Sequence, residues 1–144
     1  MFWQLGIFRH ARGWVLAVAI VSSVACGTSL GPSSPLPTGG WGGDHVSMIV
    51  GESSVHIELD CAHADITGVL LIDARGQFNA TGTFVREHGG PIRLGEPPDS
   101  HPASFAGSVT STIMALTIRL TDTDDVIGNF TLARGTAGRV VKCL

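Results

Sequence analysis

Apolar and polar residues alternate along this chain from residue 45 onward, in short runs separated by turn-forming residues. In the clearest run, Val55, Ile57 and Leu59 share one face, and His56 and Glu58 share the other. A period of two is typical of a β-strand with one buried face, and no stretch has a sustained helical period. The pattern predicts strands at residues 45–50, 55–61, 66–72, 77–86, 103–110, 113–120, 126–132 and 139–143.

Most of these predicted strands are joined by short turns, which favours an antiparallel meander. Closing a meander into a barrel removes its exposed edges. We therefore expect an all-β fold, a small up-and-down antiparallel β-barrel of about eight strands. A two-sheet β-sandwich is the alternative.

The composition excludes other classes of protein. The 144-residue chain is 44% hydrophobic and 15% charged, and it contains 19 Gly. It is too apolar for a disordered chain and too rich in Gly for a helical bundle. Lys and Arg number 9 against 12 Asp and Glu, so no basic surface is available for phosphates and we expect no nucleic-acid partner.

Residues 1–25 have the pattern of a secretory signal peptide. Arg9 and Arg12 precede an apolar run at residues 13–21 that is too short for a permanent transmembrane helix. Cys26 follows at the position where a bacterial lipoprotein carries its lipid, although Ser23 stands where such proteins usually have Leu. We expect an extracytoplasmic protein of the bacterial cell envelope, held on the membrane through a lipidated Cys26. Plain secretion and a retained helical anchor are the alternatives.

The chain has 3 Cys, an odd number for an oxidising compartment. Lipidation of Cys26 would leave Cys61 and Cys143, which we expect to form a disulfide. Two separate buried thiols are the alternative, and export disfavours it. The two residues lack CxxC spacing, so a redox-active pair or a thiolate zinc site has little support.

Residues 26–43 are mostly Gly, Ser, Thr and Pro. Such a segment buries too little apolar surface to offset its ordering entropy. We therefore expect a flexible tether here, followed by the barrel domain at residues 44–144. Trp41 is the exception within the tether: it either plugs one end of the core or stacks on a ligand, which makes it a candidate cofactor-binding residue.

In an up-and-down meander, alternate links lie at the same end of the barrel. One end then collects both remaining cysteines, four of the histidines, Trp41 and the long connection at residues 87–102. If the alternation of inward and outward side chains continues from the strands into these links, the histidines that point toward the barrel mouth are His63, His88 and His101. Three neutral imidazoles can bind a divalent transition metal, so the sequence predicts a metal site there.

A second interpretation of these histidines is structural, because a long loop often needs imidazoles to bond its own carbonyls. Arg86 has the same inward parity as His88. We consider it a candidate anion-binding or cofactor-binding residue, with a salt bridge to Glu87 or Asp60 as the alternative.

Four strings spread over the predicted domain are WGGDH at residues 41–45, ELDCAHADI at 58–66, FVREHGGPIRLGEPPDSHPA at 84–103 and VVKCL at 140–144. They resemble a group of uncharacterised bacterial exported proteins and lipoproteins that share WGGxH, DCAH, REHGGP and KCL motifs. The resemblance implies that the EHGGP loop and the two cysteines belong to a shared design. It brings no catalytic residues.

The first functional hypothesis is therefore a non-catalytic binding module that presents its His-rich end to a small molecule or a metal. The second is a structural or protein-interaction domain of the cell envelope without a ligand. A metal-dependent hydrolase, with Glu87 as general base, has the least support. No catalytic residue is assigned.

Overall fold

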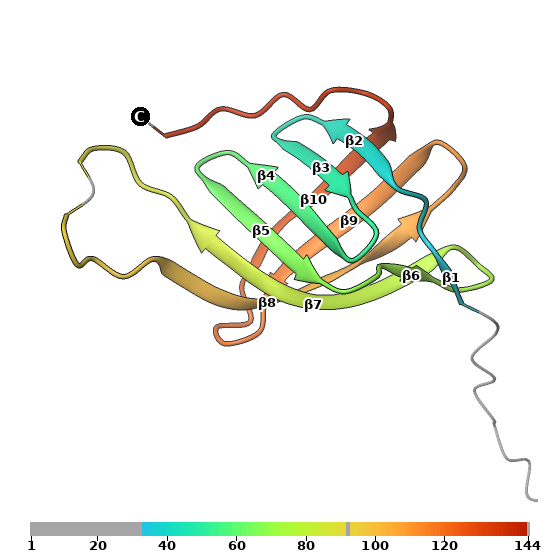
Figure 1. Ribbon diagram of the computed structural model, residues 1–144, viewed down its shortest axis with the longest axis horizontal. Coiled ribbons are helices and arrows are strands. Elements are labelled where there is room, and N and C mark those ends of the chain that lie inside the picture. Colours follow the sequence, from blue (N-terminus) through green and yellow to red (C-terminus); the bar gives the residue numbers. More distant parts are fainter. Residues whose placement is uncertain (1–32, 92, 144) are drawn as a thin grey trace, which may run out of the picture.

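The computed structural model describes residues 33–91 and 93–143, and it shows a closed, antiparallel eight-stranded β-barrel (Figure 1). Around the barrel the strands follow their order in the chain. They are β2 (Gly39–Gly43), β3 (Val46–Val50), β4 (Ser54–Leu59), β5 (Ala62–Thr67), β7 (Gln77–Arg86), β8 (Asp99–Val109), β9 (Ile113–Leu120) and β10 (Val126–Arg134). A small sheet pairs β1 (Ser34–Pro35) with β6 (Leu71–Ile72). The predicted up-and-down barrel is confirmed, and the sandwich is excluded.

Among the residues described, none forms a helix long and apolar enough to cross a membrane. The predicted signal peptide at residues 1–25 and the predicted lipidation site, Cys26, lie outside the described residues.

One predicted domain boundary is wrong, because part of the expected tether is a strand of the barrel. β2 pairs with β3 from Gly39↔Val50 to Gly43↔Val46, and Trp41 lies opposite Met48. The expected last strand, residues 139–143, is instead a segment with one isolated bridge, Asp44↔Arg139. The glycine-rich β2 has almost no side-chain pattern to mark it, and backbone bonding to its neighbours makes it a strand.

The inside of the barrel is filled with apolar side chains. One face of every long strand contributes, and residues such as Met48, Ile57, Phe105 and Ile118 are fully buried. No polar or charged residue is buried among those that the structure describes. Each such apolar side chain stabilises the fold by about 1.5–3 kcal/mol through its removal from water. The barrel is therefore a packed core rather than a hollow container.

The barrel has two different ends. The links β3–β4, β6–β7 and β8–β9 lie at one end, together with the β1–β6 sheet and the start of β2, and we call this the pocket end. The remaining links, including the long β7–β8 connection, lie at the other, which we call the loop end (Figure 1). At the pocket end the amide of Leu36 donates to the carbonyl of Leu70 at 2.8 Å. Both leucines are buried against the core, so this small sheet caps the barrel.

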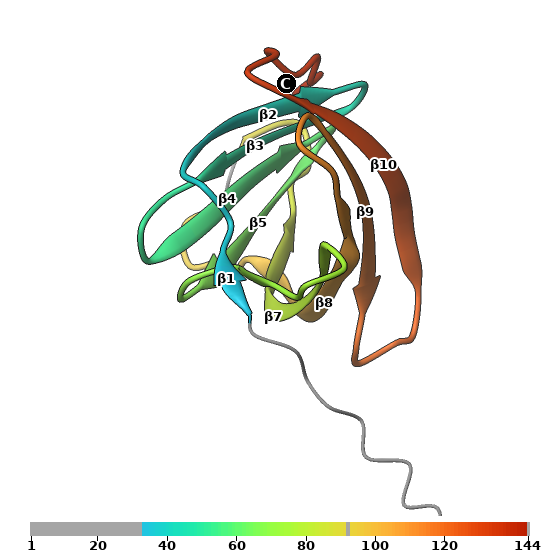
Figure 2. The same ribbon diagram turned by 90° about the vertical axis from the view of Figure 1, so that its right-hand side faces the viewer.

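After β10 the chain returns over the outside of β2 as a segment that we call the C-terminal strap, residues 135–143 (Figure 2). The amide of Gly135 donates to the Gly40 carbonyl at 2.8 Å, and that of Arg139 donates to the Gly43 carbonyl at 2.9 Å. A Cβ on Gly138 would collide with the backbone of Val46, so this close approach requires glycine.

The strap ends at the predicted disulfide between Cys61 and Cys143, which is confirmed, with Cα atoms 4.9 Å apart. The strap lies beside the seam, the junction at which β10 and β2 close the barrel. This junction is the weakest one, since β10 and β2 share only the pairs Ala133↔Gly42 and Arg134↔Trp41. The strap therefore ties β2 and the β4–β5 turn to the end of β10.

Candidate functional site

The histidines expected to point into the barrel mouth do not converge. On β5 the inward residues are Ala62, Ala64 and Ile66, and His63 lies on the outer face. The expected inward parity of His63 is wrong because the β4–β5 link is a two-residue turn in which Leu59 pairs with Ala62. Cys61 has a φ of 50° in this turn. After the turn, the inward-facing row therefore begins again at Ala62 and does not continue through Cys61 to His63.

Each of the three predicted metal ligands is paired with a carboxylate of its own. His63 Nδ1–H donates to Glu87 Oε1 at 2.7 Å. His101 donates to Asp122 from Nδ1 at 2.7 Å and to Asp99 from Nε2 at 3.0 Å. No group of three or more metal-ligating side chains gathers anywhere in residues 33–91 and 93–143. The predicted three-histidine site is therefore not formed by these residues.

The third of these histidines, His88, lies exposed in the β7–β8 connection. Its Nδ1 contacts the Gly89 carbonyl at 3.3 Å, and its Nε2 is 3.6 Å from Glu96. Pairing within the loop is the structural interpretation that the sequence left open for such a histidine.

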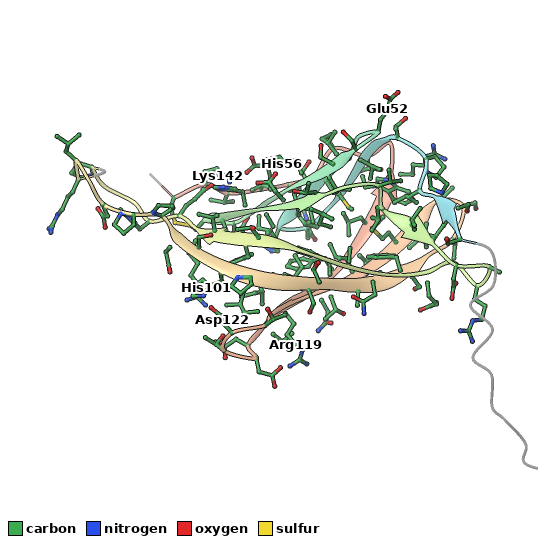
Figure 3. The ribbon with its side chains drawn as sticks, turned by 60° about the horizontal axis from the view of Figure 1, so that its bottom comes forward. Glu52, His56, His101, Arg119, Asp122 and Lys142 are labelled. Carbon is green, nitrogen blue, oxygen red and sulfur yellow. A yellow bond between two sulfur atoms is a disulfide. The ribbon has the colours of Figure 1, made fainter. Side chains whose placement is uncertain are left out.

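His56, which the sequence places on the same face as Glu58, belongs to a charged network on the outer face of β4 and β5. Its ring donates to Asp65 at 2.7 Å and to Glu58 at 2.8 Å. Lys142 of the strap contacts Glu58 and also donates to Glu87 at 3.1 Å. Figure 3 shows His56 and Lys142 on one side of the barrel and His101 with Asp122 on another.

Two of these histidines have a raised pKa. Hydrogen bonding to Asp65 and then to Glu58 raises the pKa of His56. Hydrogen bonding to Asp122 raises the pKa of His101. A ring that donates from both nitrogens is an imidazolium. These histidines therefore act as cations for their carboxylate partners, which leaves no free ring nitrogen for a metal.

Trp41 lies near the opposite end of the barrel from the histidines, so the expectation that it shares their end is wrong. Its side chain is 2% exposed and faces the core from β2. It lines a pocket of about 300 Å³ at the pocket end. The apolar lining comes from Leu36, Pro37, Trp41, Ile72 and Val109, and the polar lining comes from Thr110, Ser111 and Arg134.

Local backbone contacts place the walls of this pocket. The amide of Val109 donates to the Gly76 carbonyl at 2.8 Å, and Gly76 has a φ of 76°. A Cβ on Gly76 would collide with the Val109 carbonyl, so the β6–β7 turn approaches β8 this closely only with glycine. On the other side, the amide of Arg134 donates to the Thr112 carbonyl at 2.9 Å. The pocket is therefore built between two turns and the cap.

Two residues that line the pocket have polar groups without partners among the described residues. The indole Nε1–H of Trp41 is buried and has no hydrogen-bond acceptor there. The Arg134 guanidinium makes neither an ion pair nor a side-chain hydrogen bond with that part of the chain. Both groups are donors only. An unpaired buried N–H costs about 1–3 kcal/mol, so its presence in a native structure calls for an explanation.

Arg86, the other candidate cofactor-binding residue, lies at the loop end in a separate pocket of about 260 Å³. It forms no salt bridge with Glu87 or Asp60, as far as the described residues go. Glu87, Glu96 and Asp99 line the same pocket. Three carboxylates around one guanidinium make this an unfavourable place for an anion.

No protein-family model matches this chain, and no curated protein or solved structure matches it significantly.

Proposed function

We propose that this protein is an exported, lipid-anchored, non-catalytic binding module, and that its ligand site is the pocket beside Trp41. The observation that carries the proposal is a pocket of about 300 Å³ with mostly apolar walls, whose lining includes Arg134, a cation that has no ion pair with the described residues. The pocket also has the usual make-up of a ligand site, apolar walls with a few polar groups, at the lower end of the usual size range.

Export and anchoring rest on the signal-like residues 1–25, on Cys26 and on the disulfide, which is consistent with an oxidising compartment. Residues 27–33 separate Cys26 from β1, and a chain of that length spans at most about 30 Å. Since β1 lies at the pocket end, a lipid on Cys26 would hold that end within about 30 Å of the bilayer surface. The proposed site would then be close to the membrane.

Binding can be followed through Trp41 itself. The chain has 3 Trp and no Tyr, and the other two tryptophans, Trp3 and Trp14, lie in the expected signal peptide. In the mature protein the tryptophan emission therefore comes from the pocket wall. We expect decanoate, a small amphiphile, to change this emission in a saturable way.

A matched pair of variants tests the location. Ser111→Phe places a ring in the pocket and should abolish the change in emission. Thr112→Phe adds the same ring in the same turn at an exposed residue outside the pocket lining and should preserve it. Unaltered binding by Ser111→Phe would contradict the proposed site.

The filled barrel interior favours one other function, a structural or protein-interaction domain of the cell envelope without a ligand. Native mass spectrometry of the protein from its source separates the two. A bound small molecule supports the binding module, and a consistently bare chain together with a flat fluorescence titration supports the structural domain.

A further inference from the structure

The size of the Trp41 pocket limits what it can hold. Its volume is about 300 Å³. An apolar cavity of about 150 Å³ holds one benzene molecule, so this pocket suits a ligand portion of roughly a dozen non-hydrogen atoms. Four aliphatic lining residues, Leu36, Pro37, Ile72 and Val109, would cover a hydrocarbon tail.

The polar part of the lining favours a ligand that accepts hydrogen bonds and carries negative charge. No carboxylate of the described residues lines the pocket, whereas Arg134 offers the donors of its guanidinium. The Thr110 hydroxyl is already engaged, since it donates to the Ile113 carbonyl at 3.1 Å. The Arg86 pocket at the loop end has the opposite character, with three carboxylates in its lining.

Strand register places Arg134 beside Trp41 at the apolar wall. Arg134 on β10 lies directly opposite Trp41 on β2, and residues paired in this way project from the same face of the sheet. Leu132, two residues before Arg134, is fully buried, so Arg134 continues an inward-facing row to the rim of the barrel. A head group at this rim would meet the guanidinium while its tail enters the apolar part.

Nearby acidic groups compete little for this guanidinium. Among the described residues, the links at the pocket end carry two carboxylates, Glu52 and Asp73. Asp73 accepts hydrogen bonds from the amides of Arg75 and Gln77, both at 2.8 Å. Most of the acidic side chains in the links lie at the loop end. The charge distribution thus leaves Arg134 free to attract an anion.

Resting on the proposed function, we infer that the ligand is a small amphiphilic carboxylate, whose head group pairs with Arg134 and whose hydrocarbon tail packs beside Trp41. For a ligand of this size, a dissociation constant between about 10 µM and 1 mM is expected.

The test compares three ten-carbon amphiphiles, namely decanoate, decanol and decyltrimethylammonium, each titrated against the mature protein with Trp41 emission as the readout. We expect decanoate to bind most tightly. Arg134→Gln should weaken decanoate binding about twofold to fivefold, the usual range for an ion pair with an exposed side chain, and should leave decanol binding unchanged. Arg75→Gln, at an exposed cation of the same end outside the pocket, is the matched control.

The outcomes separate this inference from the proposed function. Equal binding of decanoate and decanol, or decanoate binding that is insensitive to Arg134→Gln, overturns the carboxylate and leaves the binding module standing. Preferential binding of the cationic amphiphile also overturns it. If none of the three binds and native mass spectrometry finds a bare chain, the proposed function falls as well. Thermal unfolding of each variant verifies that it is folded.

Discussion

Removing the disulfide between Cys61 and Cys143 should cost this protein about 4.5 kcal/mol of unfolding free energy. The two residues are 82 positions apart, so the cross-link closes most of the folded chain into one loop. In the chain-entropy model, a loop of this length lowers the entropy of the unfolded state enough to account for that value. Small domains are stable by only about 5–15 kcal/mol, so the loss would leave a marginal fold.

The perturbation is the double substitution Cys61→Ser and Cys143→Ser, which also frees the end of the strap. The assay is urea unfolding at equilibrium, followed through Trp41. With a denaturant slope of about 1.5–2 kcal/mol per molar urea, the midpoint should fall by about 2–3 M. Cys26→Ser leaves the cross-linked pair intact and is the control.

A loss below about 1 kcal/mol would refute the reasoning, because it would mean that the cross-link hardly restrains the unfolded chain. A second readout is amide hydrogen exchange. The amide of Arg139 in the strap, which bonds to the Gly43 carbonyl at 2.9 Å, should lose protection in the double variant before the amides of the central strands do.

Three further predictions follow from local contacts. The raised pKa of His101, caused by its hydrogen bond to Asp122, adds stability that is lost as the pH rises through that pKa, and the lowered pKa of Asp122 adds stability that is lost as the pH falls through it. The pair should therefore stabilise the folded protein most between about pH 4 and 6.5. Between pH 6 and pH 9, the melting temperature of His101→Asn should drop less than that of the unaltered chain. Gly76→Ala should destabilise the protein by about 2–4 kcal/mol in chemical unfolding, because the new Cβ meets the Val109 carbonyl. Gly135 has a similar φ of 73° but open space around it, so Gly135→Ala should cost only about 1 kcal/mol. Equal losses in the two variants would contradict the steric argument. Lys142→Met should cost about 0.5–1 kcal/mol at low salt and less in 1 M NaCl, since its ion pairs are partly exposed and screened, and a salt-independent loss would point to packing instead.

Strand content and direction could be predicted from the sequence because alternation is a local property. Along β4 and β9, a residue such as Ile57 or Leu116 belongs to a row of apolar residues two positions apart, and the structure buries that row as the pattern requires. Short links then made neighbouring strands antiparallel. The pairing of the cysteines followed from their number, because lipidation of Cys26 leaves only Cys61 and Cys143 to pair in an oxidising compartment.

The candidate site could not be predicted in the same way. Parity extrapolated through the turn at residues 60–61 placed His63 inside, and one backbone conformation at Cys61 reversed it. A two-residue turn at residues 60–61 places Glu58 opposite His63. With that turn recognised, the sequence would have predicted the charged network on the outer face of β4 and β5 instead. For the pocket no comparable signal exists, since its walls come from the cap, two turns and the seam.

The amino-acid order alone thus determined the class of fold, the inward rows of the long strands and the cysteine partners. Tertiary structure alone made the glycine-rich segment at residues 39–43 a strand, placed Trp41 beside Arg134 and laid the strap over β2. The physical reason is the separation along the chain between the residues that interact. Periodicity expresses what one strand does with its two faces, whereas the barrel closes through backbone hydrogen bonds and close glycine contacts between segments about 90 residues apart, and these have no local pattern.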